Sequence, residues 1–577
     1  MFLISNRPFK SSERVFPKLY VKGDYIKLGD FIFFICGEIF EPFMLNDALS
    51  SLMEDPENIK IFLGEFSLAW SNGLKVWLAV DRLGPRRLYY YLKGDLFIVS
   101  TSFWDILKII EPEEEDLDGL ALKELVVLFK PFNGRTFIKN LKYLMPGEIL
   151  EYDLIKNNVR SWTYYDFRFT PEHSLTVDKA VRRFESAIDK TIKVAVSRNR
   201  EKIFGVPISG GLDSRIIPYF LKKFGVKSMV GYIIGKEKPH KIFPSYDHLN
   251  ASRIAKIYNI PLVSIDYDHE DFEHKAILDI KAEPIYTSNI LKSTYFSFFD
   301  LIVGGGYGTI IGGHILSKRI LKMNLEELVD FLISHYSLLK YRSKPSLLQF
   351  LMSLLGRGGG QPIRLRKSIP GVISEEEFHK IRIEFKNYVE SELNKGKKPG
   401  DIAMKYHLSL SHACGAFESL SCNVKSYSIY YPYMLNEIVK WPLNLLIGRK
   451  VLRRFIFVRL PELSKIPSQD PDVPLYFDFV RINGLKRFLL KLLHYVMFVL
   501  LGRSLNYNKW IRSKKFRKFA GNVMSRPNPL FRKFFFIKSI DVLLKDKNIN
   551  PFIIETLIKV KLMLDIIYYR EYHRILD

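Results

Sequence analysis

Cysteine is scarce in this sequence, which contains only Cys36, Cys414 and Cys422 among 577 residues. Three thiols are too few for the disulfide framework of a small secreted domain, and no Cys-x-x-Cys pair offers a metal site. Because disulfides are rare in reducing compartments, the cysteine content predicts a cytoplasmic protein.

Long apolar runs are also missing. The N-terminal residues lack the basic segment and apolar run of a signal peptide. The most apolar window, Phe488 to Gly502, contains Lys491 and His494 and is shorter than the roughly 20 residues that cross a bilayer. We therefore expect no transmembrane segment and interpret this window as a buried or interfacial helix.

Acidic residues are few near the C-terminus. The chain has 87 Lys and Arg and 62 Asp and Glu, a net charge of +25, and residues 481–577 hold 21 of the former and 6 of the latter, or 21 − 6 = +15. Such a segment can contact nucleic acid, an acidic membrane surface or an acidic partner. A set of solvated helix faces is the simpler interpretation.

The remaining composition is that of a folded protein, with 47% hydrophobic and 14% aromatic residues. At roughly 100 to 200 residues per domain the length indicates about three domains, which we place at residues 1–165, 170–480 and 481–577. The first is β-rich, with short β-branched and aromatic runs. Its expected strands are Asp30 to Phe40, Gly64 to Trp70, Lys75 to Asp81, Arg87 to Leu92 and Asp95 to Ser100, with helices at Leu45 to Met53 and Phe103 to Ile110.

Strands and helices alternate from about residue 175, which predicts a parallel sheet covered by helices. Ligands of such sheets bind beyond the carboxyl ends of the strands. Residues 320–480 and the last hundred residues are expected to be mostly helical, with Gly356 to Gln361 as a loop. The expected strands are Ile203 to Ile208, Ser228 to Ile234, Pro261 to Tyr267 and Leu301 to Val303, and the helices Thr176 to Val196, Ser214 to Phe224 and Leu249 to Tyr258.

Residues 208–215 read Ile-Ser-Gly-Gly-Leu-Asp-Ser-Arg, between an expected strand and helix. The glycines let backbone N–H groups approach an anion, and the helix adds its positive N-terminal end. We predict a phosphate site at Ser209, Gly210, Gly211, Asp213 and Ser214, with Asp213 as a Mg²⁺ ligand. The loop is not a Walker A sequence, because Gly-Lys-Ser/Thr is absent. A helix N-cap at Asp213 or Ser214 is the structural alternative.

The Ser-Gly-Gly-x-Asp-Ser string resembles the pyrophosphate loop of the ATP pyrophosphatases, which split ATP into AMP and pyrophosphate. Asp247 and Ala251 resemble the Asp-x-x-x-Ala helix that follows the second strand of that fold, and Val230 occupies the position where that strand lines the adenine. The resemblance implies ATP and Mg²⁺ as cofactors.

The N-terminal third resembles a class II glutamine amidotransferase domain, and about residues 1 to 475 together resemble the glutamine-hydrolysing asparagine synthetase family. Later segments agree: Tyr431-Pro432-Tyr433 resembles the Tyr-Pro-Phe of the family, and Lys450 to Arg453 its Lys-x-x-Leu-Arg. The N-terminal segments are Cys36-Gly37-Glu38-Ile39, Gly64-Glu65-Phe66, Asp81 to Tyr90 and Leu144-Met145-Pro146-Gly147.

The resemblance implies an α/β protein. An N-terminal class II glutamine amidotransferase-like (Ntn hydrolase) αββα sandwich is followed by a parallel-sheet ATP pyrophosphatase (adenine nucleotide alpha hydrolase-like) domain and a helical C-terminal tail. In the family, the first domain releases ammonia from glutamine. The second adenylates the side-chain carboxylate of aspartate, and ammonia displaces AMP to give asparagine.

The first departure from the family lies in the amidotransferase domain. The nucleophile of the family is a Cys directly after the initiator Met, and here this residue is Phe2. Cys36 replaces the Asn of an Asn-Gly-Glu segment that stabilises the oxyanion. We therefore expect no glutaminase activity.

The second departure concerns the other domain. Residues 303–313 align with a loop that carries Glu and Asp in the family, and here Gly305 replaces the Glu and Gly308 the Asp. The backbone of Gly304 and Gly305 can still bind phosphate. Tyr430 replaces an Arg, and Ser468 to Asp470 replaces a segment that contains Lys. His314 is the histidine nearest the expected site, although a packing role is the simpler interpretation.

The leading hypothesis is an asparagine synthetase-like ATP-dependent ligase that adenylates aspartate or another acid, for amidation by ammonia or by an amine. β-Lactam synthetases and lasso-peptide cyclases, which also lack the N-terminal Cys, are precedents for the amine. The alternatives are a non-catalytic nucleotide-binding or regulatory homologue and a tRNA-modifying ATP pyrophosphatase. The expected partners are a small carboxylate, ammonia or an amine, and an acidic surface for the basic tail. The sequence identifies no catalytic residue.

Overall fold

We analysed a computed structural model of the chain. It describes all residues except 43, 236, 238–243, 266–271, 283, 285–298, 313–314, 343–362, 414–423, 468–474, 480–483, 502–510, 512, 538–539, 547–548 and 574–577. Gly313, His314, Gly356 to Gln361, Ser468 to Asp470, Cys414 and Cys422 therefore lie outside the described residues.

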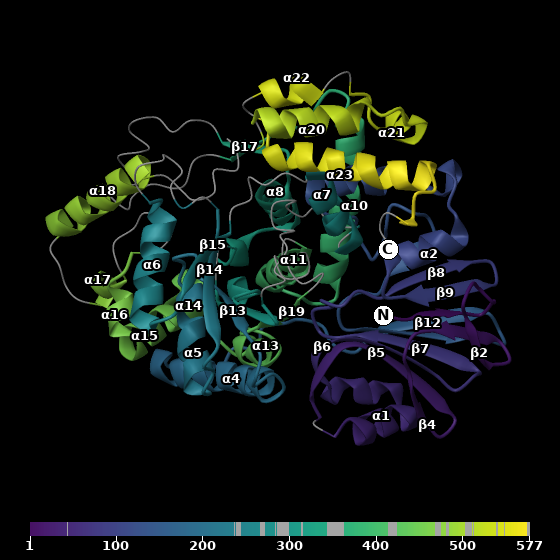
Figure 1. The fold of residues 1–577 in the computed structure, drawn as a ribbon, viewed down its shortest axis with the longest axis horizontal. Helices are drawn as coiled ribbons and strands as arrows, with labels where there is room; N and C mark the ends of the chain where they lie inside the picture. Colours follow the sequence, from purple (N-terminus) through teal and green to yellow (C-terminus); the bar gives the residue numbers. More distant parts are fainter. Residues whose placement is uncertain are drawn as a thin grey trace.

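The N-terminal part contains two six-stranded antiparallel sheets, with strand orders β10-β8-β9-β1-β3-β2 and β12-β11-β7-β6-β5-β4 (Figure 1). All five strands and both helices expected here are confirmed, and their observed ends differ from the expected ones by at most two residues. The strands are β1 (Leu3–Ser5), β2 (Glu13–Phe16), β3 (Leu19–Lys22), β4 (Ile26–Leu28), β5 (Phe31–Glu41), β6 (Leu63–Ser71), β7 (Lys75–Val80), β8 (Tyr89–Lys93), β9 (Leu96–Ser100), β10 (Leu141–Tyr143), β11 (Glu148–Asp153) and β12 (Asn158–Thr163).

Apolar side chains stack these sheets and helices into four layers. Phe2, Ile4 and Phe34 belong to the core between the two sheets. Helix α1 (Leu45–Glu54) buries Leu49 against the outer face of the second sheet. Helices α2 (Phe103–Ile110) and α3 (Gly119–Leu128) belong to the core that includes the first sheet. Because β6 is covered on both faces, every one of its residues is buried.

The second part contains a five-stranded sheet with the order β15-β14-β13-β16-β19, and all of its strand pairs are parallel. The predicted α/β class and parallel sheet are confirmed. β19 is the strand that the sequence did not indicate, because it lies in the region interpreted as mostly helical. The strands are β13 (Phe204–Pro207), β14 (Met229–Ile234), β15 (Leu262–Ile265), β16 (Leu301–Gly304) and β19 (Lys425–Ser428).

The direction of the chain across this sheet reverses between β13 and β16. Starting from β13, the chain adds β14 and β15 on one side and β16 and β19 on the other. In open parallel sheets the crevice beyond such a reversal is the preferred place for a ligand.

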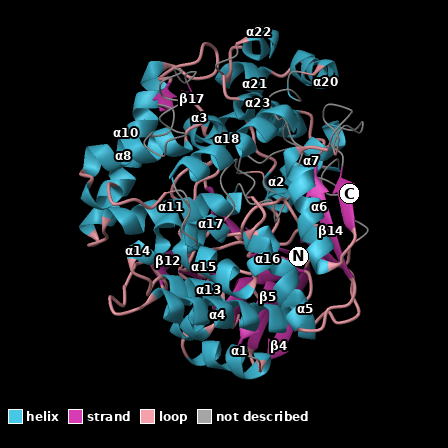
Figure 2. Cartoon of the chain, turned by 90° about the vertical axis from the view of Figure 1, so that its left-hand side faces the viewer, coloured by secondary structure: helices cyan, strands magenta, loops and turns pink. Residues whose placement is uncertain are grey.

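Helices cover most of the strands, as Figure 2 shows. The helix expected from Thr176 is α4 (Val177–Ser197), with the Thr176 hydroxyl accepting a hydrogen bond from the N–H of Lys179. The remaining α-helices are α5 (Ile217–Lys223), α6 (Tyr246–Tyr258), α7 (Phe272–Ala282), α8 (Leu325–Tyr336), α10 (Glu375–Asn394), α11 (Pro399–Ala413), α13 (Tyr433–Ile438), α14 (Leu443–Leu446), α15 (Lys450–Arg459), α16 (Pro461–Ser464), α17 (Tyr476–Phe479), α18 (Gly484–Leu501), α20 (Lys514–Ser525), α21 (Pro529–Phe534), α22 (Ile540–Lys545) and α23 (Pro551–Tyr568). Among the described helices, none combines the length and apolar character needed to cross a membrane.

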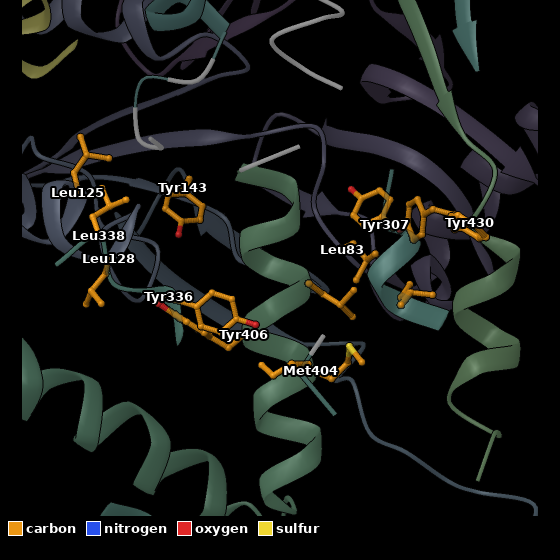
Figure 3. Close-up of a cluster of buried hydrophobic side chains, with 14 of the residues drawn as sticks. Leu83, Leu125, Leu128, Tyr143, Tyr307, Tyr336, Leu338, Met404, Tyr406 and Tyr430 are labelled. Carbon is orange, nitrogen blue, oxygen red and sulfur yellow. The ribbon is translucent and has the colours of Figure 1, made fainter. Parts of the chain in front are cut away.

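One apolar core joins the two parts of the chain. Figure 3 shows Leu83 and Tyr143 of the N-terminal part in the same cluster as Tyr307, Met404 and Tyr430. The two parts therefore share buried surface rather than being joined by a linker alone.

The C-terminal helix α23 is buried between α3, α7 and the other helices of the tail. It carries charges into this interior: Lys559 Nζ lies 2.9 Å from Asp279 Oδ2 on α7, and both side chains are at most 2% exposed. Part of the charge of the basic tail is thus internal and does not belong to a solvated face.

Asp279→Ala is expected to destabilise the protein by about 3 kcal/mol, because it leaves the Lys559 ammonium buried without its carboxylate. The double variant Asp279→Ala/Lys559→Met should recover most of this loss. Urea unfolding followed by circular dichroism measures both. Equal stability of the single and double variants would contradict a buried ion pair.

Candidate functional site

Two glycine-containing loops meet at the reversal point of the parallel sheet. The first, residues 208–213, follows β13, and the second, residues 305–307, follows β16. A Cβ added to Gly305 would lie 3.0 Å from the Cβ of Asp213, so the loops are in contact. The structure thus brings together the two segments that the sequence analysis assigned to phosphate.

The first loop turns at Gly210, whose φ of +77° is in the left-handed region that favours glycine. The Ser209 and Ser214 hydroxyls lie 3.3 Å apart, and Ser214 Oγ accepts the N–H of Ser209 at 3.3 Å. Asp213 precedes the 3-10 helix Ser214–Ile216 but makes no cap hydrogen bond through its side chain. Asp213 thus occupies the N-cap position without capping the helix through its carboxylate.

Arg215 stabilises this loop by hydrogen bonds to its backbone, and its side chain is completely buried. The guanidinium donates to the carbonyl oxygens of Gly210 at 2.7 Å and Gly211 at 3.1 Å. On its other side it donates to the carbonyls of Leu463, Ile466 and Pro467 at 2.8 to 3.0 Å. Burial lowers the pKa of Arg215 to about 10, so it stays charged at neutral pH. Sequence reasoning assigned no role to Arg215, and its only signal was its place at the end of the motif 208–215.

Both carboxylate oxygens of Asp213 already have protein partners. Arg449 Nη1 lies 2.6 Å from Oδ2, and the Tyr430 hydroxyl donates to Oδ1 at 3.0 Å. Tyr430 is completely buried, and it follows β19, where Ser428 Oγ donates to the carbonyl oxygen of Gly306. The second loop, the end of β19 and the residue before α15 therefore meet around one carboxylate.

Gly308 also lies against Asp213, at a position where the sequence resemblance predicts an Asp in related chains. A Cβ added to Gly308 would lie 2.7 Å from Asp213 Oδ1, closer than real Cβ atoms approach an oxygen. A carboxylate at residue 308 would thus require Asp213 to move. The glycine and the present position of Asp213 depend on each other.

A resident metal does not fit this arrangement. The described residues contain no group of three His, Cys, Asp or Glu side chains that could hold one, and Arg449 already neutralises Asp213. Mg²⁺ in nucleotide enzymes is often held by one or two protein carboxylates together with substrate phosphates. The site fits a metal that arrives with a phosphate ligand and uses one protein carboxylate.

The other expected nucleotide residues lie on neighbouring elements. Helix α6 abuts the first loop, since a Cβ added to Gly210 would lie 3.3 Å from the Cβ of Asn250. Asp247, on the same helix, is 2% exposed. Val230 is half-buried at the second position of β14, paired with Gly205, and thus lies toward the amino end of this strand rather than at the loop edge.

The N-terminal part has apolar packing where the amidotransferase family has its nucleophile. The Phe2 side chain is 3% exposed, and its ring centroid lies 5.2 Å from that of Phe34. Cys36 is half-buried on β5. The Phe2 side chain itself is apolar, and its backbone N–H donates to the Thr101 hydroxyl at 3.3 Å.

Residues that matched the amidotransferase pattern instead bind the second part of the chain. The Glu38 carboxylate accepts hydrogen bonds from Lys425 and Tyr427 at β19, the latter at 2.6 Å. Arg198 also lies 3.4 Å from Glu38. These pairs lower the pKa of Glu38, although burial acts in the opposite direction as the largest single effect.

Asp81 is a second link between the two parts. Its carboxylate accepts the N–H groups of Phe66, Leu83 and Gly84 at 2.9 to 3.0 Å and the hydroxyl of Tyr431. Burial raises the pKa of Asp81 to about 6, against the lowering effect of these hydrogen bonds. The hydrogen bond from Tyr431 connects Asp81 to the turn that also carries Tyr430.

Comparison with known proteins gives a weak similarity to asparagine synthetases. No family model matches the chain. It is 24% identical over 229 residues to the "putative asparagine synthetase (glutamine-hydrolyzing) 2" of Methanocaldococcus jannaschii, covering 36% of this chain and 43% of that protein. The chain therefore spans less than half the length of this curated relative.

Two solved structures give a partial match at 10% identity. One, an allosteric regulatory enzyme of purine biosynthesis, has a TM-score of 0.19, with 44% of this chain and 69% of that chain covered. The other, the B. subtilis glutamine phosphoribosylpyrophosphate amidotransferase in complex with ADP and GMP, has a TM-score of 0.18, with 43% and 51% covered. Likeness at these scores carries no argument about the site.

The raised pKa of Asp81 has a consequence for stability. The folded state holds the Asp81 proton more tightly than the unfolded chain, so this group makes stability fall as pH rises from about 4 to 6. Tyr431→Phe removes a donor to the ionised carboxylate and is expected to cost about 2 kcal/mol at pH 8. At pH 5, where Asp81 is largely protonated, the cost should be about 1 kcal/mol.

Denaturant unfolding at both pH values measures this difference. Thr136→Val is the matched control, because the buried Thr136 hydroxyl donates to the neutral carbonyl of Leu141 at 2.7 Å and its loss should not depend on pH. The same loss for Tyr431→Phe at pH 5 and pH 8 would contradict the role given to Asp81.

Proposed function

We propose that this protein is an ATP-dependent ligase of the asparagine synthetase type. It adenylates the carboxylate of aspartate or another acid, and ammonia or an amine then displaces AMP to form a C–N bond. The observation that carries the proposal is the contact between the loop 208–213 and Gly305 at the reversal point of the sheet. The weak sequence similarity to an asparagine synthetase supports it.

The proposed cofactors are ATP and Mg²⁺. Backbone N–H groups of glycine loops are suited to phosphate oxygens, and Ser209 and Ser214 would act as hydroxyl donors. A metal bound with the nucleotide would neutralise charge on the departing pyrophosphate. Asp213 is the residue that would hold it.

Arg449 has to change partner in this proposal. Its guanidinium lies 2.6 Å from Asp213, and a phosphate group competes well for an arginine because it accepts two parallel N–H donors. ATP would thus draw Arg449 away from Asp213 and free the carboxylate. In this proposal, ATP binding itself breaks the Arg449–Asp213 ion pair.

Phe2 supports the use of free ammonia or an amine instead of glutamine. The N-terminal part would act as a scaffold, held to the second part through Glu38 and Asp81.

A second candidate function is nucleotide binding without turnover. Two observations favour it: the Asp213 carboxylate is neutralised by Arg449, and Gly305 and Gly308 supply no carboxylate base. In this case the Arg449–Asp213 ion pair would stay intact, and the chain would act as a sensor of nucleotide.

Incubation with ATP, Mg²⁺, ammonium and a panel of carboxylic acids that begins with aspartate is expected to yield AMP and pyrophosphate. Glutamine should not replace ammonium, because there is no nucleophile at residue 2. Anion-exchange chromatography of the nucleotides measures AMP directly. Absence of AMP with every acid, at micromolar enzyme and with bound ATP detectable, would reject the ligase and leave the second candidate.

Arg449→Ala is expected to change how ATP affinity depends on Mg²⁺. The variant exposes the Asp213 charge, which repels free ATP and attracts the metal complex. The ratio of Kd without Mg²⁺ to Kd with Mg²⁺ should rise about tenfold, which corresponds to the loss of one charge-assisted hydrogen bond of about 1.5 kcal/mol. Equilibrium dialysis with labelled ATP measures both constants.

Arg454→Ala is the matched control, because Arg454 pairs with Asp178 at 3.1 Å on the exposed side of α15. An unchanged ratio of the two Kd values in Arg449→Ala would contradict the proposed exchange of Arg449 between Asp213 and ATP.

A further inference from the structure

Helix α18 exposes an apolar face to solvent. The side chains of Leu485, Leu489, Leu493, Val496 and Leu500 are 67%, 54%, 54%, 42% and 70% exposed. Their spacing of four, four, three and four residues puts them on one face of the helix. Single exposed leucines are ordinary, but a continuous apolar stripe marks a surface that contacts something else.

The position of α18 leaves this stripe accessible. In Figure 1 the helix lies at the left-hand edge of the molecule, beyond α6, and α6 is the described element on which it packs. The stripe lies on one face of α18, and the helix contacts α6.

The other helices of the tail are different. Phe516, Phe519 and Val523 of α20 are buried, and α23 is buried along most of its length. The tail can therefore bury its apolar residues within the molecule where it folds against the body. The exposed stripe of α18 is an exception among the described helices of the tail, which indicates a contact outside the molecule.

The stretch of sequence that contains α18 carries charge of one sign. Residues 479–540 contain 15 Lys and Arg and no Asp or Glu. On α18 itself Lys486 is exposed and Lys491 half-buried, and Lys514, Lys515 and Lys518 are exposed on α20. An apolar stripe within an acid-free cationic segment is complementary to an anionic lipid surface, where acyl chains lie beneath phosphate headgroups.

The length of α18 determines how it can meet a bilayer. It has 18 residues, including Lys486 and Lys491, and none of the described helices is long and apolar enough to span. Such a helix lies in the plane of the surface, with its apolar face at the boundary of headgroups and acyl chains.

We propose that α18 is a membrane-surface anchor that binds anionic bilayers, with its apolar stripe inserted below the headgroups and the exposed Lys486 of the same helix on the lipid phosphates. This inference is independent of the ligase proposal, because it uses no residue of the nucleotide site.

Flotation of the full chain with vesicles tests the anchor. Vesicles of phosphatidylcholine with 30% phosphatidylglycerol are expected to bind at least tenfold more protein than phosphatidylcholine alone at 0.1 M NaCl, and 0.5 M NaCl should weaken the binding. Leu489→Glu/Leu493→Glu should reduce binding at least tenfold. Val542→Glu is the matched control, since Val542 of α22 is 64% exposed and outside the stripe.

Insertion is tested separately with Leu489→Trp, whose emission should shift to the blue and be quenched by brominated acyl chains when anionic vesicles are added. Circular dichroism confirms that the variants are folded. Three results would overturn the anchor: equal binding to both lipids, binding unaffected by Leu489→Glu/Leu493→Glu, or a change in oligomeric state alone in that variant. The last result would make the stripe a contact between two copies of the chain.

Discussion

The carboxylate of Asp213 is the point on which the arrangement of the site depends. The tight approach of Gly305 and Gly308, the buried hydroxyl of Tyr430 and the guanidinium of Arg449 all involve this group. A like charge at residue 308 would be both too close and repulsive. The glycines at residues 305 and 308, the tyrosine at 430 and the arginine at 449 are therefore structurally interdependent.

The contact between the two parts of the chain gives the N-terminal part a structural role at the site. Asp81 and Glu38 accept hydrogen bonds from Tyr431 and Tyr427. Tyr431 directly follows Tyr430, the partner of Asp213. The N-terminal part thus fixes the turn that carries Tyr430.

Periodicity predicted β5 to β9 and four of the five strands of the parallel sheet, and α4 to within one residue at each end, but it gave no bounds for β2 to β4 or β10 to β12. It failed for β19, because Lys425-Ser-Tyr-Ser428 is short and lacks an apolar run, although the strand is buried next to β16. The loop 209–214 was recognisable from local sequence. Its pairing with Arg449 was not, because 236 residues separate this arginine from Asp213 and only the fold brings them together. Asp213 as a metal ligand and Val230 as an adenine contact stay predictions.

The burial of α23 has a consequence for the order in which the protein can fold. Arg570, two residues after this helix, donates to the carbonyl oxygen of Pro112, 458 residues earlier in the chain. Helix α3 therefore keeps part of its apolar surface uncovered until residues 551–568 have been added to the chain. Contacts so distant in sequence form slowly, and a nascent chain exposes such surfaces until the distant segment is available.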